Sequence, residues 1–216
     1  MNSRNLLVLA IALLMFPQIA QTLYSPALAD IGQAFAVGPQ RAAQTLSVFF
    51  LAFAFGVVVW GRLCDRIGRR PTMLIGLALY TGASILALSV GDFTALLAAQ
   101  ALAAFGAAVG SVVTQTLLRD RFKGAELAQV FSVMGIALAA SPAIGLFTGA
   151  SLVSAFGYRG VVGCLLLLAS LLWLWCLRTL PETRPGNVTV PALFETLWRM
   201  LQDLDIWRST LLVALF

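Results

Sequence analysis

The sequence predicts an all-α integral membrane protein with six membrane-spanning helices and the start of a seventh. The first reason is composition: 60% of the 216 residues are hydrophobic and only 11% are charged, whereas about a quarter of an ordinary soluble domain is charged. The second is that the apolar residues form long runs without the polar face that a soluble helix shows. The third is that most Lys and Arg residues lie between these runs.

Six apolar runs divide the chain, and each approaches or exceeds the length that crosses a hydrocarbon core of about 30 Å at about 1.5 Å per residue. They cover residues 6–29, 42–60, 72–90, 93–118, 127–153 and 161–177. Because the connections are short, neighbouring helices must run antiparallel. A basic start and the sequence ALA at 27–29 are also compatible with a cleaved secretory signal. The length of the first run and the five runs after it favour a retained helix.

The positive charges predict the orientation. With the N-terminus in the cytoplasm, twelve of the fourteen Lys and Arg residues fall in cytoplasmic segments, and Arg41 and Arg159 fall outside. The positive-inside rule therefore predicts a cytoplasmic N-terminus. It also places residues 61–71, which contain four arginines, in a cytoplasmic loop between the second and third helices.

Three regions follow along the chain. Residues 1–178 are expected to form the six-helix bundle, and residues 179–205 a cytoplasmic linker with an amphipathic helix. The leucines on one face of that helix are Leu193, Leu197, Leu201 and Leu204. Residues 206–216 begin a seventh helix of roughly 16 Å, about half the membrane core. A chain that ended at residue 216 would place its ionised C-terminal carboxylate near the middle of the bilayer, at a cost of several kcal/mol. We therefore expect the sequence to be a fragment of a longer protein or the product of a truncated gene.

The composition excludes several classes of function. The chain has no histidine, which removes Ser–His and Cys–His catalytic sites and histidine-ligated metals. It carries no GxSxG, HExxH or GxxxxGK pattern, and Cys64, Cys164 and Cys176 indicate neither disulfides nor a zinc site. The chain has a net charge of +5, and its positive residues lie mostly between the apolar runs. In these positions they determine on which side of the membrane each connection lies. We therefore expect no enzyme activity, no metal, no cofactor and no nucleic-acid partner.

Residues 61–71, GRLCDRIGRRP, resemble the cytoplasmic signature of the major facilitator superfamily, G-x-L-x-D-R-x-G-R-R/K. Scattered Lys and Arg would satisfy the orientation rule, so the glycines and the aspartate need another explanation. The matching residues are Gly61, Leu63, Asp65, Arg66, Gly68, Arg69 and Arg70. The resemblance implies the N-terminal half of a transporter, a 3+3 inverted repeat of helices, whose partner is a missing C-terminal six-helix half.

Three further stretches resemble the drug:proton antiporter branch of that superfamily, the Bcr/CflA type, and within it the multidrug resistance protein D group. They are QIAQTLYSPALADIGQAFAV at 18–37, TLLRD at 116–120 and LPETRP at 180–185. The resemblance implies export of drugs or other lipophilic small molecules across the bacterial inner membrane by alternating access, driven by the proton gradient. A non-transporting fragment and a half-transporter that needs a second half remain as alternatives.

The resemblance also implies a conformational latch, which holds the two halves together while the outside is open. Its candidate residues are Gly61, Asp65, Arg66, Gly68, Arg69, Arg70, Arg119 and Asp120. We expect Arg69 to pair with Asp120, and Asp65 to stabilise a facing helix N-terminus or an arginine. The positive-inside rule explains Arg62 and Arg66 as well as a latch does. It does not explain Asp65, because a carboxylate does not contribute to membrane orientation.

The fifth run contains GIALAASPAIGLFTGA at 135–150, which resembles an antiporter motif where a Gly-Pro pair precedes paired glycines. Pro142 and Gly145 match, and Gly149 completes a GxxxG spacing. The sequence departs from the motif at Ser141 and Leu146. Proline and small residues at these positions favour a bend and close helix packing.

Polar side chains within apolar helices predict a substrate cavity. Those on the first helix share a face by their spacing, and are Gln18, Gln21, Thr22 and Ser25. Those on the fourth helix are Gln100, Ser111, Thr114 and Gln115. Aromatic candidates are Tyr24, Phe105 and, more weakly, Tyr80. The alternative is hydrogen bonding between helices, which contributes about 0.6–2 kcal/mol per contact. A neutral lining favours lipophilic substrates.

Proton coupling needs a titratable group that reaches both sides of the membrane. In the family the fourth helix often supplies an arginine for coupling, and Gln100 stands in its place. Asp30, near the outer end of the first helix, is the candidate proton site of this half. The alternatives for Asp30 are a solvated residue or a helix-end partner.

Overall fold

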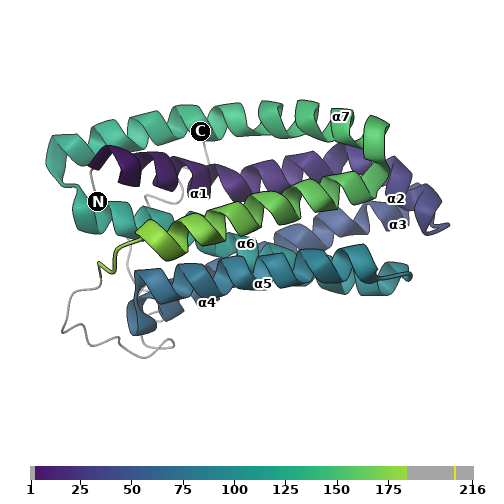
Figure 1. Ribbon diagram of the computed structural model, residues 1–216, viewed down its shortest axis with the longest axis horizontal. Helices are drawn as coiled ribbons and strands as arrows, with labels where there is room; N and C mark the ends of the chain where they lie inside the picture. The colour runs from purple at the N-terminus through teal and green to yellow at the C-terminus, as the bar shows by residue number, and fades with distance from the viewer. Residues whose placement is uncertain (1–2, 184–206, 208–216) are drawn as a thin grey trace. The chain divides into compact units, whose positions relative to one another are not determined.

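The computed structural model describes residues 3–183 and 207, and every regular element within them is helical (Figure 1). The all-α prediction is therefore confirmed. The elements are α1 (Ser3–Tyr24), the 3₁₀ turn η1 (Ser25–Ala27), α2 (Leu28–Ala34), α3 (Pro39–Ala42), α4 (Gln44–Ile67), α5 (Arg69–Ser89), α6 (Phe93–Arg121) and α7 (Gly124–Thr179). They belong to one compact unit, Met1–Arg184. The predicted linker helix and the start of the seventh helix lie outside the described residues, apart from 179–183 and 207.

Within the described residues, five helical stretches are long and apolar enough to cross a membrane. They are Asn5–Ala34, Pro39–Ile67, Arg69–Ser89, Phe93–Arg121 and Gly124–Thr179. Large hydrophobic side chains cover much of the exposed surface: Leu51 is 75% exposed, Ile136 71% and Phe147 74%. Such exposure is unfavourable in water and favourable in lipid, since the hydrophobic effect scales with the apolar area removed from water.

The longest element, α7, contains a sharp bend. It has 56 residues, and Gly157 within it has φ 65° and ψ −167°, far from helical values. The chain folds back at this point, so the two arms of α7 run antiparallel (Figure 1). The arms contain the predicted runs 127–153 and 161–177. A straight helix of this length would be about 84 Å long, nearly three times the thickness of a hydrocarbon core.

The prediction of a loop at residues 61–71 is wrong. The helix α4 continues to Ile67 and α5 begins at Arg69, so Gly68 alone joins them. Its φ of 103° is readily open to glycine and rarely to other residues, and the chain reverses in a single step. The first run likewise continues through η1 into α2 and ends at Ala34. Apolar content therefore marks the part of a helix that lies in the membrane, and the helices themselves extend beyond it.

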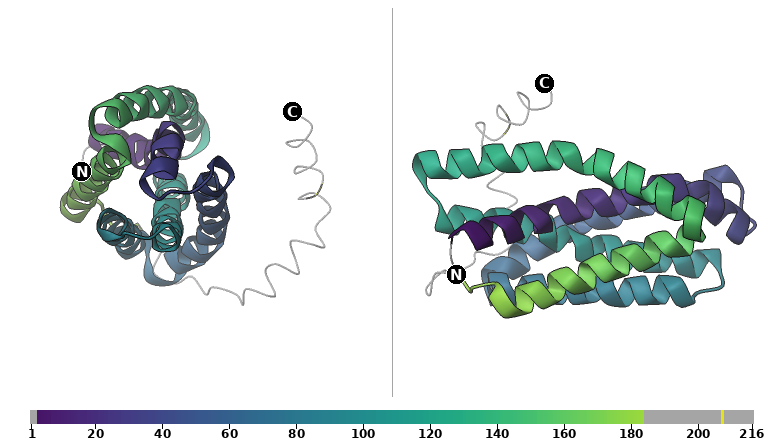
Figure 2. Two further views of the ribbon diagram at one scale, coloured as in Figure 1. Left: turned by 90° about the vertical axis from the view of Figure 1, so that its right-hand side faces the viewer. Right: turned by 45° about the horizontal axis from the view of Figure 1, so that its top comes forward.

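The helix α6 is the most buried of the five candidate spans and packs against α1, α4 and α5 (Figure 2). Glycines let the backbones approach closely. A Cβ atom at Gly106 would lie 2.7 Å from the carbonyl oxygen of Gly76, and one at Gly110 would lie 2.6 Å from that of Leu13. Small residues at helix contacts are the usual route to such packing in membranes.

The predicted glycine motif of the fifth helix packs the first arm of α7 against α1. Gly145 and Gly149 are both buried. A Cβ at Gly145 would collide with the hydroxyl of Thr22, and one at Gly149 would lie 2.6 Å from the carbonyl oxygen of Leu23. The helix continues through Pro142. Both glycines thus lie in close contact with α1, and the antiporter role of the motif remains a prediction.

We expect Gly149→Ala to destabilise the bundle by about 1–3 kcal/mol, the usual cost of overpacking, because the added methyl group meets a backbone carbonyl that cannot rotate away. The measurement is the thermal unfolding midpoint of the purified chain in detergent micelles. The matched control is Gly135→Ala on the same arm, where no atom lies within 4 Å of the added Cβ. An equal loss of stability in both variants would contradict this account of the contact.

Candidate functional site

The basic signature folds around Gly68, at the end of the bundle where α4 meets α5. Gly68 has φ 103° and ψ 167° and is the N-cap residue of α5. A Cβ atom here would lie 2.5 Å from a carboxylate oxygen of Glu182. The hydroxyl of Thr72 donates to the Gly68 carbonyl oxygen at 2.6 Å. Glycine is therefore required at position 68 both by its backbone conformation and by the space available.

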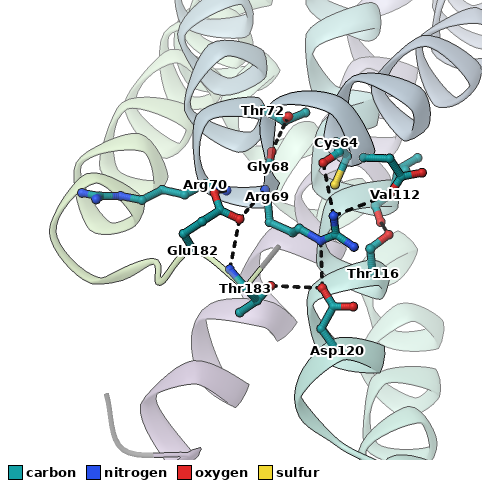
Figure 3. A network of polar contacts seen from close by, with 11 residues as sticks. Cys64, Gly68, Arg69, Arg70, Thr72, Val112, Thr116, Asp120, Glu182 and Thr183 are labelled. Carbon is teal, nitrogen blue, oxygen red and sulfur yellow. Dashed lines mark hydrogen bonds and ion pairs between the residues drawn. The ribbon is translucent and has the colours of Figure 1, made fainter. Parts of the chain in front are cut away.

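Arg69 lies at the centre of the polar network in Figure 3. Its Nε donates to Oδ2 of Asp120 at 2.8 Å, and its Nη1 donates to the carbonyl oxygen of Cys64 at 3.3 Å. Asp65 Oδ1 lies 3.6 Å from Nη1. The predicted pair of Arg69 and Asp120 is thus present. The Arg69 side chain is only 8% exposed, and a buried charge needs such partners.

Glu182 completes the network from the segment after α7. Its carboxylate accepts hydrogen bonds from the backbone N–H groups of Arg69 at 3.0 Å and Arg70 at 3.1 Å. These are the first two N–H groups of α5, which have no partner within the helix. A carboxylate at a helix N-terminus also interacts favourably with the helix dipole. Glu182 therefore caps α5 from more than a hundred residues away in the sequence.

Two more contacts tie the end of α7 to this site. Nη2 of Arg70 donates to the carbonyl oxygen of Leu177 at 2.9 Å, near the C-terminus of α7, where a cation is favourable. The hydroxyl of Thr183 donates to Oδ2 of Asp120 at 3.1 Å. The site thus joins the α4–α5 turn, the end of α6 and the segment after α7. We call this the Gly68 clasp: Asp65, Gly68, Arg69, Arg70, Asp120, Glu182 and Thr183.

Sequence reasoning did not assign Glu182 to this site. The signal was available, because Glu182 lies in the LPETRP stretch, directly after the last span and on the same side as the basic signature. Charge complementarity between these two segments would have suggested the contact. The backbone cap, by contrast, depends on the exact approach of residue 182 to the turn, and no spacing in the sequence specifies that.

The other predicted latch residues lie around the clasp. The guanidinium carbon of Arg119 lies 5.9 Å from the centre of the Phe131 ring, a cation–π distance, so Arg119 contacts α7. Arg66 is exposed. A Cβ atom at Gly61 would lie 3.6 Å from the Val112 side chain, which places Gly61 at the contact between α4 and α6. The role of these residues as a latch remains a prediction.

The predicted cavity residues of α1 differ in their surroundings. Gln18 and Gln21 are half-buried. The Thr22 hydroxyl donates to the carbonyl oxygen of Gln18 at 2.8 Å, and its side chain lies against Gly145, so Thr22 faces α7. Tyr24 is buried, with 3% of its surface exposed. The cavity role of all four remains a prediction.

The predicted cavity residues of α6 also divide. Gln100 is 3% exposed, whereas Ser111 and Gln115 are half-buried. The Phe105 ring centre lies 5.1 Å from that of Trp60 on α4, and the Phe105 carbonyl oxygen accepts a hydrogen bond from the Trp60 indole at 2.6 Å. Phe105 therefore faces α4. Among the described residues, no hydrogen bond joins the polar stripes of α1 and α6.

Asp30 belongs to α2, which lies at the opposite end of the bundle from the turn between α4 and α5 (Figure 1). Its Oδ2 accepts a hydrogen bond from the backbone N–H of Tyr158 at 2.5 Å. Tyr158 directly follows the bend of α7 at Gly157. Of the interpretations given by the sequence, this contact matches a helix-end partner. A proton-carrying role for Asp30 remains a prediction.

Long apolar helices, with polar side chains between them and a charged clasp at one end, define a multi-pass helical membrane protein. Comparison with known families specifies it further. The model of the Major Facilitator Superfamily matches residues 9–216, so the chain belongs to this superfamily. This is a family of transporters and not of enzymes.

Curated relatives include proteins named for drug resistance. The chain is 30% identical to Multidrug resistance protein D of Escherichia coli over 84% of its own length and 46% of the relative's. It is 28% identical to the Bicyclomycin resistance protein homolog of Haemophilus influenzae over 96% of its length and 52% of the relative's. The chain thus spans about half the length of the curated relatives it matches.

Solved structures share the fold at low sequence identity. The human organic anion transporter MFSD10 superposes on 89% of the chain with a TM-score of 0.68 at 22% identity. A peptide transporter, POT, superposes on 97% of the chain with a TM-score of 0.69 at 15% identity. The chain covers 51% and 46% of these two structures. They support the fold of a transporter half.

We expect Asp120→Ala to destabilise the chain by about 2–3 kcal/mol, because it leaves the buried Arg69 guanidinium without its closest carboxylate. Asp65→Ala is the matched control. The Asp65 side chain is 50% exposed and 3.6 Å from Arg69, so its loss should cost less than about 1 kcal/mol. Unfolding in mixed detergent and dodecyl sulfate micelles measures both. A larger loss for Asp65→Ala would contradict this ranking.

Proposed function

We propose that the chain forms the N-terminal half of a transporter that exports lipophilic small molecules in exchange for protons. The observation that carries the proposal is the Gly68 clasp, which places the superfamily signature, with Arg69 bonded to Asp120 at 2.8 Å, at one end of the described bundle. The drug-resistance names of the relatives support the substrate class. The second half of the transporter would come from outside the described residues.

In this proposal the bundle crosses the membrane six times, because each arm of α7 is a separate span. Each arm is about as long as, or longer than, the 20 or so residues that cross a bilayer. The N-terminus and the Gly68 end face the cytoplasm of a bacterial inner membrane. The arginines at this end support that orientation, as the positive-inside rule requires. They include Arg62, Arg66, Arg69, Arg70, Arg119 and Arg121.

The Gly68 clasp would act as one side of the latch between two rocking halves. Arg69 is held by Asp120 and Glu182 within this half. Asp65 is half-exposed and more distant from Arg69, so its carboxylate is available to a helix N-terminus or a cation of the second half. Closing this contact would favour the state that is open to the outside.

The substrate would be held mainly by hydrophobic contact. Inside the described spans, the proposed cavity residues are neutral, and Gln18, Gln21, Ser111 and Gln115 are half-buried, as side chains at the edge of a cavity between two halves would be. Neutral amides orient a ligand without requiring it to be charged. The proton-binding carboxylate is then either Asp30 or a group of the second half.

We expect cells that express the chain, within any longer reading frame that contains it, to export cationic lipophilic dyes, and Asp65→Asn to reduce the rate about fivefold or more, the range of a typical coupling energy. The measurement is dye efflux at equal protein abundance in the membrane. The matched control is Glu126→Gln, which neutralises another exposed carboxylate at the same end of the bundle. Equal rates for Asp65→Asn and the parent would contradict the latch.

A second substitution tests the cavity. If Gln21 contacts the substrate, Gln21→Leu changes the relative efflux rates of a panel of dyes that differ in polarity, because it removes one donor and one acceptor. Gln129→Leu, an exposed position on α7, serves as the control. An unchanged order of substrates in Gln21→Leu would identify Gln21 as a structural residue.

A further inference from the structure

The bend of α7 is held by a second cluster of contacts, at the end opposite the Gly68 clasp. Gly157 makes the bend with φ 65°, and the next residue, Tyr158, donates its backbone N–H to Asp30 Oδ2 at 2.5 Å. This N–H begins the second arm of α7, where helical N–H groups lack partners within the helix. Asp30 comes from α2, 128 residues earlier in the chain.

The side chain of Tyr158 is held as well as its backbone. Its ring centre lies 5.5 Å from that of Phe35, and Phe35 lies 6.1 Å from Phe93 at the start of α6. The Tyr158 hydroxyl accepts a hydrogen bond from Nε of Arg159 at 3.3 Å, and Tyr158 is only 6% exposed. Residues 30–35 therefore hold Tyr158 at two points, through the backbone and through the ring.

The two ends of the bundle use the same construction. At each end a glycine with positive φ makes a bend, the next residue begins a helix, and a carboxylate from a distant part of the chain accepts its N–H. A Cβ at Gly157 would lie 2.9 Å from Asp30 Oδ2, as one at Gly68 would lie 2.5 Å from Glu182 Oε2. A 3+3 inverted repeat would place these two bends in equivalent positions at opposite ends.

Helix α6 begins differently, which shows that a distant cap is not a general feature of this chain. Its N-cap residue is Asp92, whose own carboxylate accepts from the backbone N–H groups of Ala95 and Thr94 at 3.0 and 3.1 Å. These hydrogen bonds, chiefly that from Ala95, lower the pKa of Asp92. Asp92 thus caps the N-terminus of α6 from the adjacent chain position, and this cap requires no contact with another helix. The caps from Asp30 and Glu182, by contrast, join separate elements.

We propose that Asp30, Phe35, Gly157 and Tyr158 form a Tyr158 clasp, which fixes the bend of α7 and makes α1, α2 and both arms of α7 move as one rigid body. The segment just before Asp30 packs on the first arm of α7, because Gly149 of that arm lies against Leu23 and Pro26. Asp30 then binds the start of the second arm. Residues 23–35 therefore bridge the bend, and the bend angle cannot change while both contacts hold.

The proposal concerns the described bundle alone and does not require transport. Its test is residue-resolved hydrogen exchange of the 216-residue chain in lipid nanodiscs. Asp30→Ala removes the acceptor, and we expect exchange at residues 158–160 to become about tenfold faster, as the loss of one charge-assisted hydrogen bond predicts. Exchange at Arg69 and Arg70, whose N–H groups are capped by Glu182, should not change. Glu182→Ala is the matched variant and should have the reverse pattern.

The variant Asp30→Asn separates the cap from the charge. Asparagine keeps an acceptor oxygen but cannot carry a titratable proton, so a cap predicts that exchange at residues 158–160 stays close to that of the parent chain. Exchange as fast as in Asp30→Ala would overturn the proposal and would favour the carboxylate charge, which the proton-site hypothesis requires. Unchanged exchange in Asp30→Ala would overturn it directly.

Gly157→Ala provides an independent test from the other side of the contact. The added methyl group would approach Asp30 Oδ2, and φ 65° is strained for alanine. We expect faster exchange at residues 158–160 in this variant, and the combination with Asp30→Ala to be less than additive, because both changes remove the same contact. Full additivity would show that the two residues act separately and would overturn the clasp.

Discussion

The close approach of helix backbones at glycines is the constraint on which this bundle depends. Gly56, Gly76, Gly106, Gly110, Gly145 and Gly149 each face a neighbouring helix with no room for a Cβ atom. In a lipid environment the hydrophobic effect does not drive helices together, so dispersion contacts between well-fitted surfaces must do so. The positions of the charged clasps follow from this packing, because it determines which helix ends meet.

This packing leaves the buried polar groups few hydrogen-bond partners other than one another. Arg69 is held between Asp120 and the carbonyl oxygen of Cys64, while Glu182 takes the free N–H groups at the start of α5. Without these partners, the donors would need water as an acceptor. A buried donor that is left without any acceptor costs about 1–3 kcal/mol of stability. The two clasps therefore stabilise tight bends at Gly68 and Gly157 that need no loop residues.

Sequence reasoning identified the class of fold, the superfamily and the pairing of Arg69 with Asp120. It was least successful at helix ends. It placed a loop at 61–71, where α4 and α5 meet at Gly68 alone, because apolar content reports what lies in lipid and not where hydrogen bonding stops. It assigned no role to Glu182 or Phe35, since neither belongs to a local pattern. Thr22 was grouped with Gln18 and Gln21 by spacing, although its side chain lies against Gly145.

The sequence by itself determined that the chain is helical, membrane-spanning and built on the superfamily signature, because hydrophobicity, charge placement and glycine spacing are properties of short segments. Only the tertiary structure decided which carboxylate meets which helix end. Asp30 and Tyr158 are 128 residues apart, and Glu182 and Arg69 are 113 apart. Contacts over such separations depend on the summed packing of all the helices between them, and no local pattern encodes that sum.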